Sequence, residues 1–305
     1  MMLKNLKIAS FVISSNTYPA VRNMKMQKKL FYFQSSKNRQ FYWYRQGTKE
    51  QLQGNDSHLI GNDLFLNVSD DTLSMGKKTI MAFEWALQNI DFDFFIRPTP
   101  SSYINFFNLE MYIRKYFLDK DLVYGGKIQQ TNNKFGEKIN FASGSTLILN
   151  KKCINLIIEN QNNWDHEYWD DVGLAVLLDG LGIKPSGGDR FDVRGNPYKQ
   201  KIDLTFYQYR CRSDNHYGYP RFIESHVMSS IHNLFTHKNQ GKIRKFIMST
   251  LIEFCKLIYI YQFGWKVFSI IRSLTKLVLP KFLYKFIKSI NNKKIEEFKH
   301  KRFKT

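Results

Sequence analysis

Cysteine is scarce in this chain of 305 residues, and its pattern excludes two kinds of site. Cys153, Cys211 and Cys255 are widely spaced and odd in number, so the sequence predicts neither a disulfide framework nor a paired cysteine metal motif. A reducing cytosol fits this usage best. Long uncharged runs are also missing, because none reaches the roughly 18 residues that suggest a membrane-spanning helix.

Acidic residues are few beside basic ones, 26 Asp and Glu against 46 Lys and Arg, for a net charge of +20. Residues 242–305 contribute +13 of this charge and residues 1–241 only +7. Such a basic segment suggests an anionic membrane surface or nucleic acid as a partner. The apolar run 7–14 makes a poor signal peptide, and we expect it to form a first β-strand.

Short strands and helices are expected to alternate over residues 7–182, with hydrophobic residues (43%) sufficient for a large core. Strands are predicted at 7–14, 41–47, 63–71, 93–97, 121–128 and 139–150, and helices at 76–89, 102–117, 151–161 and 170–182. Residues 185–197, rich in Gly and Pro, are predicted to form a loop. This order is typical of an α/β fold.

The last fifth of the chain has a different pattern, with apolar residues at helical spacing between Lys and Arg. We predict an α/β domain over 1–241 and a basic amphipathic helical extension over 242–305, with a second helix after Pro280. Such helices lie in membrane interfaces, where each Lys or Arg adds about 1 kcal/mol on anionic lipid. The continuous apolar stripe favours a membrane over nucleic acid. A helical pair packed on the domain, with a solvated basic face, remains an alternative.

Between residues 70 and 183 several motifs follow one another in a telling order: DDTLSMGKKTIMAFEWA, FFIRPTPSSYINFFNL, FASGSTLILN and WDDVGLAVLLDGLGI. This order resembles the fringe-like and β-1,3-galactosyl- and N-acetylglucosaminyltransferases. The matching positions are Asp70, Lys78, Thr79, Trp85, Arg97, Tyr103, Asn105, Ser143, Gly144, Asp170, Asp171, Val172 and Gly173. The likeness covers roughly the first 235 residues.

This resemblance implies a GT-A-like domain, a Rossmann-like mixed sheet flanked by helices. It also implies transfer of a hexose or N-acetylhexosamine from a nucleotide-sugar donor to a glycan or glycolipid acceptor, with inversion at the anomeric carbon. We expect a role in bacterial surface polysaccharide or lipooligosaccharide assembly, by a cytoplasmic enzyme held peripherally at the inner face of the cytoplasmic membrane.

The family's acidic metal-binding turn is missing here, because its three acidic positions correspond to Thr99, Pro100 and Ser101. Mg²⁺ and Mn²⁺ prefer charged oxygen ligands, so we assign no metal ligand in this turn. The Asp-x-Asp triplet at Asp91 and Asp93 precedes a predicted strand, and we expect it to lie at the far end of that strand from the turn.

Two alternatives to a metal-free transferase stay open. One is a metal-dependent transferase that uses Asp91 and Asp93, or Asp70 and Asp71, to hold Mn²⁺ or Mg²⁺. The other is a catalytically degenerate domain that binds glycan or serves as a scaffold.

The resemblance implies a catalytic role for Asp171, as the base that removes the proton of the acceptor hydroxyl, with Asp170 sharing or supporting it. Capping of the helix that starts there is the other reading of both acids. Without a metal, arginines must balance the diphosphate, although a solvated basic loop is an equal alternative. Donor binding is predicted for Ser14, Ser15, Asn16, Arg22, Asp70, Lys78, Arg97, Thr99, Ser101 and Ser102, and diphosphate or acceptor binding for Ser143, Gly144, Arg210, Arg212 and Arg221.

Overall fold

The computed structural model describes residues 5–213, 219–236 and 242–260. The chain divides into two compact units, residues 1–255 and 256–305. All of the predicted site residues belong to the first unit.

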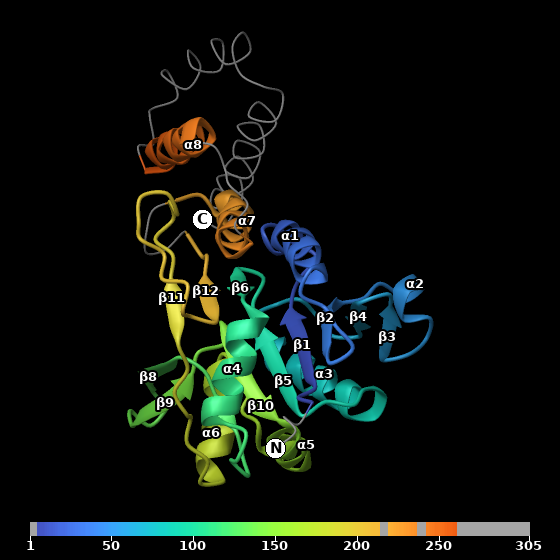
Figure 1. Ribbon diagram of the computed structural model, residues 1–305. Helices are drawn as coiled ribbons and strands as arrows, with labels where there is room; N and C mark the ends of the chain where they lie inside the picture. The colour runs from blue at the N-terminus through green and yellow to red at the C-terminus, as the bar shows by residue number, and fades with distance from the viewer. Residues whose placement is uncertain (1–4, 214–218, 237–241, 261–305) are drawn as a thin grey trace, which may run out of the picture. The chain divides into compact units, whose positions relative to one another are not determined.

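A seven-stranded mixed sheet forms the centre of this unit (Figure 1). Its strands are, in spatial order, β3 (Ser57–Ile60), β4 (Asp63–Leu66), β2 (Arg39–Gln46), β1 (Ile8–Ile13), β5 (Phe94–Pro98), β10 (Thr146–Asn150) and β7 (Tyr124–Gly125). Strands β4, β2, β1 and β5 run parallel, whereas β3 and β10 run antiparallel to their neighbours. The expected mixed α/β fold is confirmed.

Helices cover both faces of this sheet, because alternate side chains of each strand enter different cores. On β1, Ile8 and Val12 enter one core while Phe11 and Ile13 enter the other. The first core is closed by α1 (Ala20–Tyr32), α4 (Phe106–Tyr116) and α7 (Glu224–Phe235), and the second by α3 (Met75–Asn89), α5 (Lys151–Glu159) and α6 (Asp170–Gly180). The result is a three-layer α/β/α arrangement.

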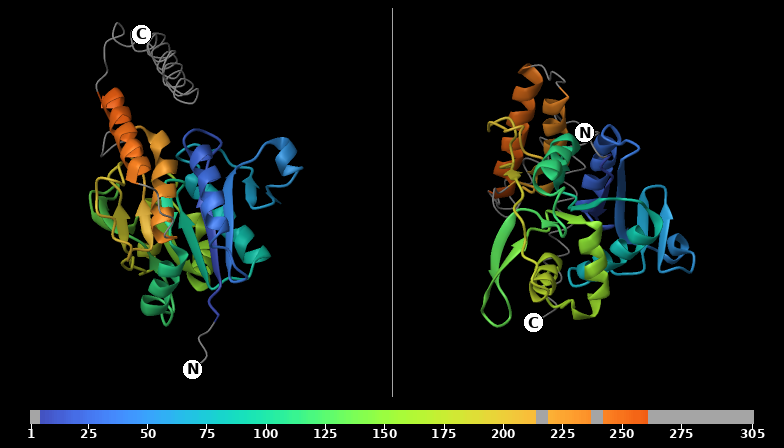
Figure 2. Two further views of the ribbon diagram at one scale, coloured as in Figure 1. Left: turned by 45° about the horizontal axis from the view of Figure 1, so that its top comes forward. Right: turned by 60° about the horizontal axis from the view of Figure 1, so that its bottom comes forward.

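Two smaller sheets accompany the central one. The first contains β11 (Arg190–Asp192), β12 (Gln208–Arg210) and β6 (Ser102–Ile104), and the second is a hairpin of β8 (Ile128–Asn132) and β9 (Lys138–Ala142). This hairpin and the short helix α2 (Lys49–Leu52) lie toward opposite edges of the central sheet, as Figures 1 and 2 show. The single turns η1 (Gln161–Asn163) and η2 (Arg221–Ile223) precede α6 and α7.

Several predicted boundaries were wrong. The strand expected at 63–71 ends at Leu66, and the one at 139–150 is two strands interrupted at 143–145. The helix expected at 102–117 begins only at Phe106, because residues 102–104 pair with β12 and the Asn105 side chain then caps the helix by accepting from the Asn108 N–H. The loop expected at 185–197 contains β11.

Helix α8 (Lys242–Ile260) confirms the first helix expected in the basic extension. Ile252 and Cys255 of this helix are buried within the first unit. The second expected helix, after Pro280, lies outside the described residues, and the division of the chain after residue 241 stays a prediction. No helix in the described part of the chain is long and apolar enough to cross a membrane.

Candidate active site

The strand order reverses between β1 and β5, since the chain moves from β1 outward to β2 and β4 and then returns to β5. In open α/β sheets, ligands bind outside the carboxyl ends of the strands at such a switch point. Residues 14–16 follow β1 and residues 99–101 follow β5. Two of the predicted donor-binding segments therefore leave the sheet from adjacent strands at this edge.

Asp70 joins three elements at the same edge. Its Oδ2 accepts from the Asn16 N–H (2.8 Å), and its Oδ1 accepts from the Gln46 N–H (3.0 Å) and from Lys78 Nζ (2.8 Å). The side chain of Lys78 is only 2% exposed and also donates to the Ser14 carbonyl (3.4 Å). This arrangement fixes the loops after β1 and β2 against the start of α3.

Arg97, on β5, forms a buried ion pair with Asp170 at the start of α6. Its Nη2 donates to Asp170 Oδ2, its Nε to the Tyr44 hydroxyl (3.0 Å) and its Nη1 to the Gly144 carbonyl (3.3 Å). All three nitrogens of the guanidinium therefore donate to the protein itself, through three of its five N–H groups. The predicted contact of Arg97 with a diphosphate stays a prediction.

Asp171 has different surroundings from Asp170. Its Oδ2 accepts from the Gly144 N–H (2.7 Å), whereas its Oδ1 has no partner among the described residues, and the side chain is partly exposed. A Cβ on Gly144 would lie 3.0 Å from Asp171 Oδ2 and 3.1 Å from Arg97 Nη1, so a larger residue would push these groups apart. Asp171 thus combines an oriented carboxylate with an available oxygen, as a general base requires.

The turn after β5 is held by hydrogen bonds rather than by charge. The Thr99 N–H and the Ser102 hydroxyl both donate to the Ser145 carbonyl (3.1 and 2.8 Å), and Gln27 Nε2 donates to the Thr99 carbonyl (3.0 Å). Ser101 and Ser102 are buried. Within the described ranges, no group of three or more His, Cys, Asp or Glu side chains is placed to hold a metal ion.

A strand that ends in an arginine pairs beside this turn. Arg210 of β12 is the antiparallel partner of Ser102, and the Cys211 N–H donates to the Ser101 carbonyl (2.7 Å). Arg212 is the next residue after Cys211 in the chain. The pairing of β6 with β12 thus brings the backbone of Arg210 beside Ser102, next to the turn.

The remaining predicted arginines lie between α1 and α7. Arg221 pairs with Glu224 (2.8 Å), a carboxylate that is fully buried and also accepts from Asn23 on α1 (2.6 Å). Arg22 donates to the Ser225 hydroxyl (3.1 Å). These contacts join α7 to α1, which lie side by side in Figure 1.

The Asp-x-Asp triplet lies at the amino end of β5, as expected. The Lys7 N–H, just before β1, donates to Asp93 Oδ2 (2.9 Å), and Lys7 Nζ forms an ion pair with the exposed Asp91. A hydrogen bond from Lys7 lowers the pKa of the Asp91 carboxyl. Both carboxylates are therefore at the sheet edge opposite to the one that Asp171 occupies.

Sequence reasoning missed Arg190 and Gln208. Arg190 donates from Nη1 to the Ser143 and Ser145 hydroxyls (3.1 Å each) and pairs with Asp192. Gln208 Nε2 donates to the same Ser145 hydroxyl (3.0 Å). No local signal points to these residues, because their contacts depend on the pairing of β11, β12 and β6 across distant parts of the chain.

No protein-family model and no curated protein matches this chain. Among solved structures it is similar to the glycosyltransferase GlyE of Streptococcus pneumoniae TIGR4, with 14% identity over 76% of this chain and 64% of that chain and a TM-score of 0.43. A second is the galactosyltransferase LgtC in complex with donor and acceptor sugar analogs (11% identity, 77% and 98% of the chains, TM-score 0.44). A third is 4-diphosphocytidyl-2C-methyl-D-erythritol synthase of Anaerococcus prevotii, with 10% identity over 61% of this chain and 88% of that chain and a TM-score of 0.38.

The chain thus spans less than two thirds of the length of the GlyE structure, and all three TM-scores are below 0.5. The function is therefore inferred from the residues of this chain. Membership of the fringe-like family stays a prediction.

Proposed function

We propose that this protein is a glycosyltransferase that moves a sugar from a nucleotide-sugar donor to a glycan or lipid-linked acceptor. One observation carries the proposal: the loop after β1, the turn after β5, Arg210 at the end of β12 and the two acids of α6 meet at one edge of the sheet, at its switch point. A nucleotide bound there would contact Ser14, Ser15 and Asn16, with its diphosphate near the turn.

In the proposed reaction Asp171 is the base of an inverting displacement. Its Oδ1 takes the proton of the acceptor hydroxyl while that oxygen attacks the anomeric carbon. The bond from this carbon to the diphosphate oxygen breaks, and the nucleoside diphosphate leaves with the electron pair. The Gly144 N–H, which donates to Asp171 Oδ2, holds the carboxylate in place.

Arginines, rather than a metal, balance the charge of the departing diphosphate in this proposal. Arg210 is paired with Ser102 beside the turn, Arg212 lies two residues further along the chain, and the guanidinium group matches phosphate oxygens in a bidentate manner. The residues of the turn do not fit a divalent cation, because Thr99 and Ser101 offer hydroxyl and carbonyl oxygens but no carboxylate.

Calorimetric titration with a panel of nucleotide sugars, in EDTA and in Mn²⁺, tests the donor and the metal together. We expect one nucleotide class to bind in EDTA. Asp171→Asn should keep donor binding while transfer falls by about 10²- to 10⁴-fold. Asp179→Asn is the matched control, since this exposed acid on the same helix pairs only with Lys184 among the described residues.

Three results would contradict parts of this proposal. Transfer that EDTA abolishes and Mn²⁺ restores would establish metal dependence instead. Full transfer by Asp171→Asn would remove this residue as the base. A chain that binds glycan but neither binds nor hydrolyses any nucleotide sugar would be the degenerate scaffold.

We also propose that α8 docks the enzyme on the cytoplasmic face of an anionic membrane, where a lipid-linked acceptor would be found. Ile252 is buried, and Glu253 accepts from Asn196 Nδ2 (2.8 Å), so this part of the helix packs within the first unit. Phe246 (74% exposed) and Phe254 (43%) face outward beside basic residues. Exposed aromatic and basic side chains on one helix are typical of membrane interfaces.

Liposome flotation of the full chain tests this docking. We expect flotation with vesicles that contain phosphatidylglycerol, a reduction in 0.5 M salt, and a further loss in Phe246→Ser with Phe254→Ser. Phe107→Ser is the matched control, because this phenylalanine of α4 is also exposed (66%). Equal loss in the control, or tighter binding to duplex DNA than to vesicles at the same salt, would contradict the proposal.

A further inference from the structure

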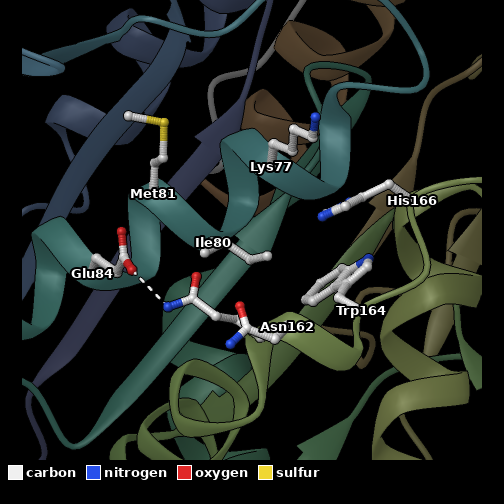
Figure 3. A pocket seen from close by; sticks show the side chains of 8 residues that line it. Lys77, Ile80, Met81, Glu84, Asn162, Trp164 and His166 are labelled. Carbon is white, nitrogen blue, oxygen red and sulfur yellow. Dashed lines mark hydrogen bonds between the residues drawn. The ribbon is translucent and has the colours of Figure 1, made fainter.

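A pocket of about 410 Å³ lies between α3 and the segment 161–166 that connects α5 to α6. Figure 3 shows Lys77 and Glu84 of α3 on one side of it and Trp164 and His166 on the other. Its volume lies within the roughly 300–1,000 Å³ of small-molecule sites. None of the residues that line it belongs to the candidate active site.

The pocket combines the partly exposed ring of His166 with uncompensated polar groups. The rings of Trp164 and His166 stack with centroids 6.1 Å apart and planes 16° apart. Opposite them, Glu84 Oε1 accepts from Gln161 Nε2 (3.0 Å), while Glu84 Oε2 and the side-chain amide of Asn162 have no partner among the described residues. Carboxylate and amide groups of this kind hydrogen-bond to hydroxyl groups.

Two further polar atoms beside the pocket lack partners. Trp164 Nε1 and His166 Nδ1 are buried and make no hydrogen bond within the described part of the chain. Both are packed against Gly76, where a Cβ would lie 2.9 Å from Trp164 Nε1 and 2.8 Å from His166 Nδ1. A ligand in the pocket would therefore hydrogen-bond to Glu84 and Asn162 and not to these two nitrogens.

The charge of the pocket favours a neutral ligand. Lys77 and Glu84 cancel one another in formal charge, and burial together with the Lys77 ammonium lowers the pKa of His166, so its imidazole is neutral near pH 7. Glu84 disfavours an anion such as phosphate, and the unpartnered polar atoms disfavour an aliphatic chain.

We propose that this pocket binds a neutral saccharide unit of the acceptor glycan, with a C–H face on the His166 ring and hydroxyl groups on Glu84 and Asn162. The assignment of the saccharide to the acceptor rests on the proposed transferase function. The pocket would hold the glycan at a distance from the reacting hydroxyl, which makes it a determinant of acceptor choice rather than of catalysis.

Saturation-transfer difference NMR of the full chain with the methyl glycosides of glucose, galactose and N-acetylglucosamine tests the pocket. We expect at least one glycoside to bind, and Glu84→Gln and His166→Ala each to weaken it by roughly tenfold or more. Unchanged melting temperatures would show that the fold is intact in both variants. Gln88→Ala, an exposed position one turn further along α3, is the matched control and should bind like the native chain.

No binding by any of the three glycosides, or equal binding by the native chain and both pocket variants, would overturn the proposal. The same samples titrated with nucleotide sugars keep the two hypotheses apart. Donor binding without glycoside binding would refute only the pocket, whereas glycoside binding that the pocket variants lose, without binding of any donor, would refute only the transferase function.

Discussion

The buried ion pair of Arg97 and Asp170 makes a strong prediction about stability. The two side chains are 2% and 8% exposed, so water cannot replace a lost partner. Asp170→Asn would keep an amide oxygen as an acceptor but remove the carboxylate charge that is paired with the guanidinium, whose other acceptors, the Tyr44 hydroxyl and the Gly144 carbonyl, are neutral. Removing one member of a buried pair costs about 3–5 kcal/mol, and we expect a loss in this range.

The pair of Lys7 and Asp91 provides the comparison, because its side chains are 46% and 71% exposed. Solvent and salt screen such a pair, and its contribution is about 0–1 kcal/mol. Asp91→Asn should therefore change the free energy of unfolding far less than Asp170→Asn, although both substitutions remove one carboxylate charge from one Lys or Arg partner.

Equilibrium unfolding in urea measures both variants, together with Arg97→Met and the double variant Arg97→Met/Asp170→Asn. The double variant should lose less than the sum of the two single losses, since the second substitution removes a charge that is already uncompensated. The reasoning is refuted if Asp170→Asn costs no more than Asp91→Asn, or if the two single losses are simply additive.

Two further predictions concern the backbone and pH. Gly126 has a φ of +153°, and a Cβ there would lie 2.7 Å from a backbone carbonyl. Gly126→Ala should therefore lower the free energy of unfolding by about 1–3 kcal/mol. Gly61 has a φ of +61° and open space around it, so Gly61→Asn should lower this free energy much less in the same urea titration. Burial lowers the pKa of His166, so below its ordinary value of 6.5 the unfolded chain binds a proton that the folded chain does not, and stability should fall as the pH is lowered. ¹³C-histidine NMR should find His166 titrating below 6.5, and His166→Gln should reduce the loss of stability in acid.

Elements with a regular apolar pattern could be predicted from the sequence, and α1 could not. The strands β1, β2 and β5 and the helices α3, α5 and α6 each bury a continuous apolar run or face. Helix α1 mixes polar and apolar residues in nearly equal number, and its buried residues include Asn23 and Gln27, whose side chains bond to distant partners. Its stability therefore depends on tertiary contacts that no local pattern reveals.

The candidate site follows the same division. Motif order singled out Asp70, Lys78, Arg97 and Gly144. In the fold, Lys78 bonds to Asp70 and Arg97 bonds to Gly144, in two hydrogen-bond networks at one sheet edge. What the sequence could not supply was their pairing. The contact of Arg97 with a donor stays a prediction, and the sequence could not show that its guanidinium donates to Asp170, because only the folded chain brings the start of α6 beside β5.

The two neighbouring acids of α6 should separate stability from catalysis. Asp170 compensates a buried charge, so Asp170→Asn should destabilise the fold and reduce transfer only as folded enzyme is lost. Asp171 accepts one backbone N–H and keeps a free oxygen within the described structure, so Asp171→Asn should leave the unfolding midpoint nearly unchanged while transfer falls. Transfer rates per folded molecule, measured beside urea midpoints, test this. If Asp171→Asn destabilised the chain as much as Asp170→Asn, its carboxylate would be a helix-start contact, as the capping interpretation of the sequence holds.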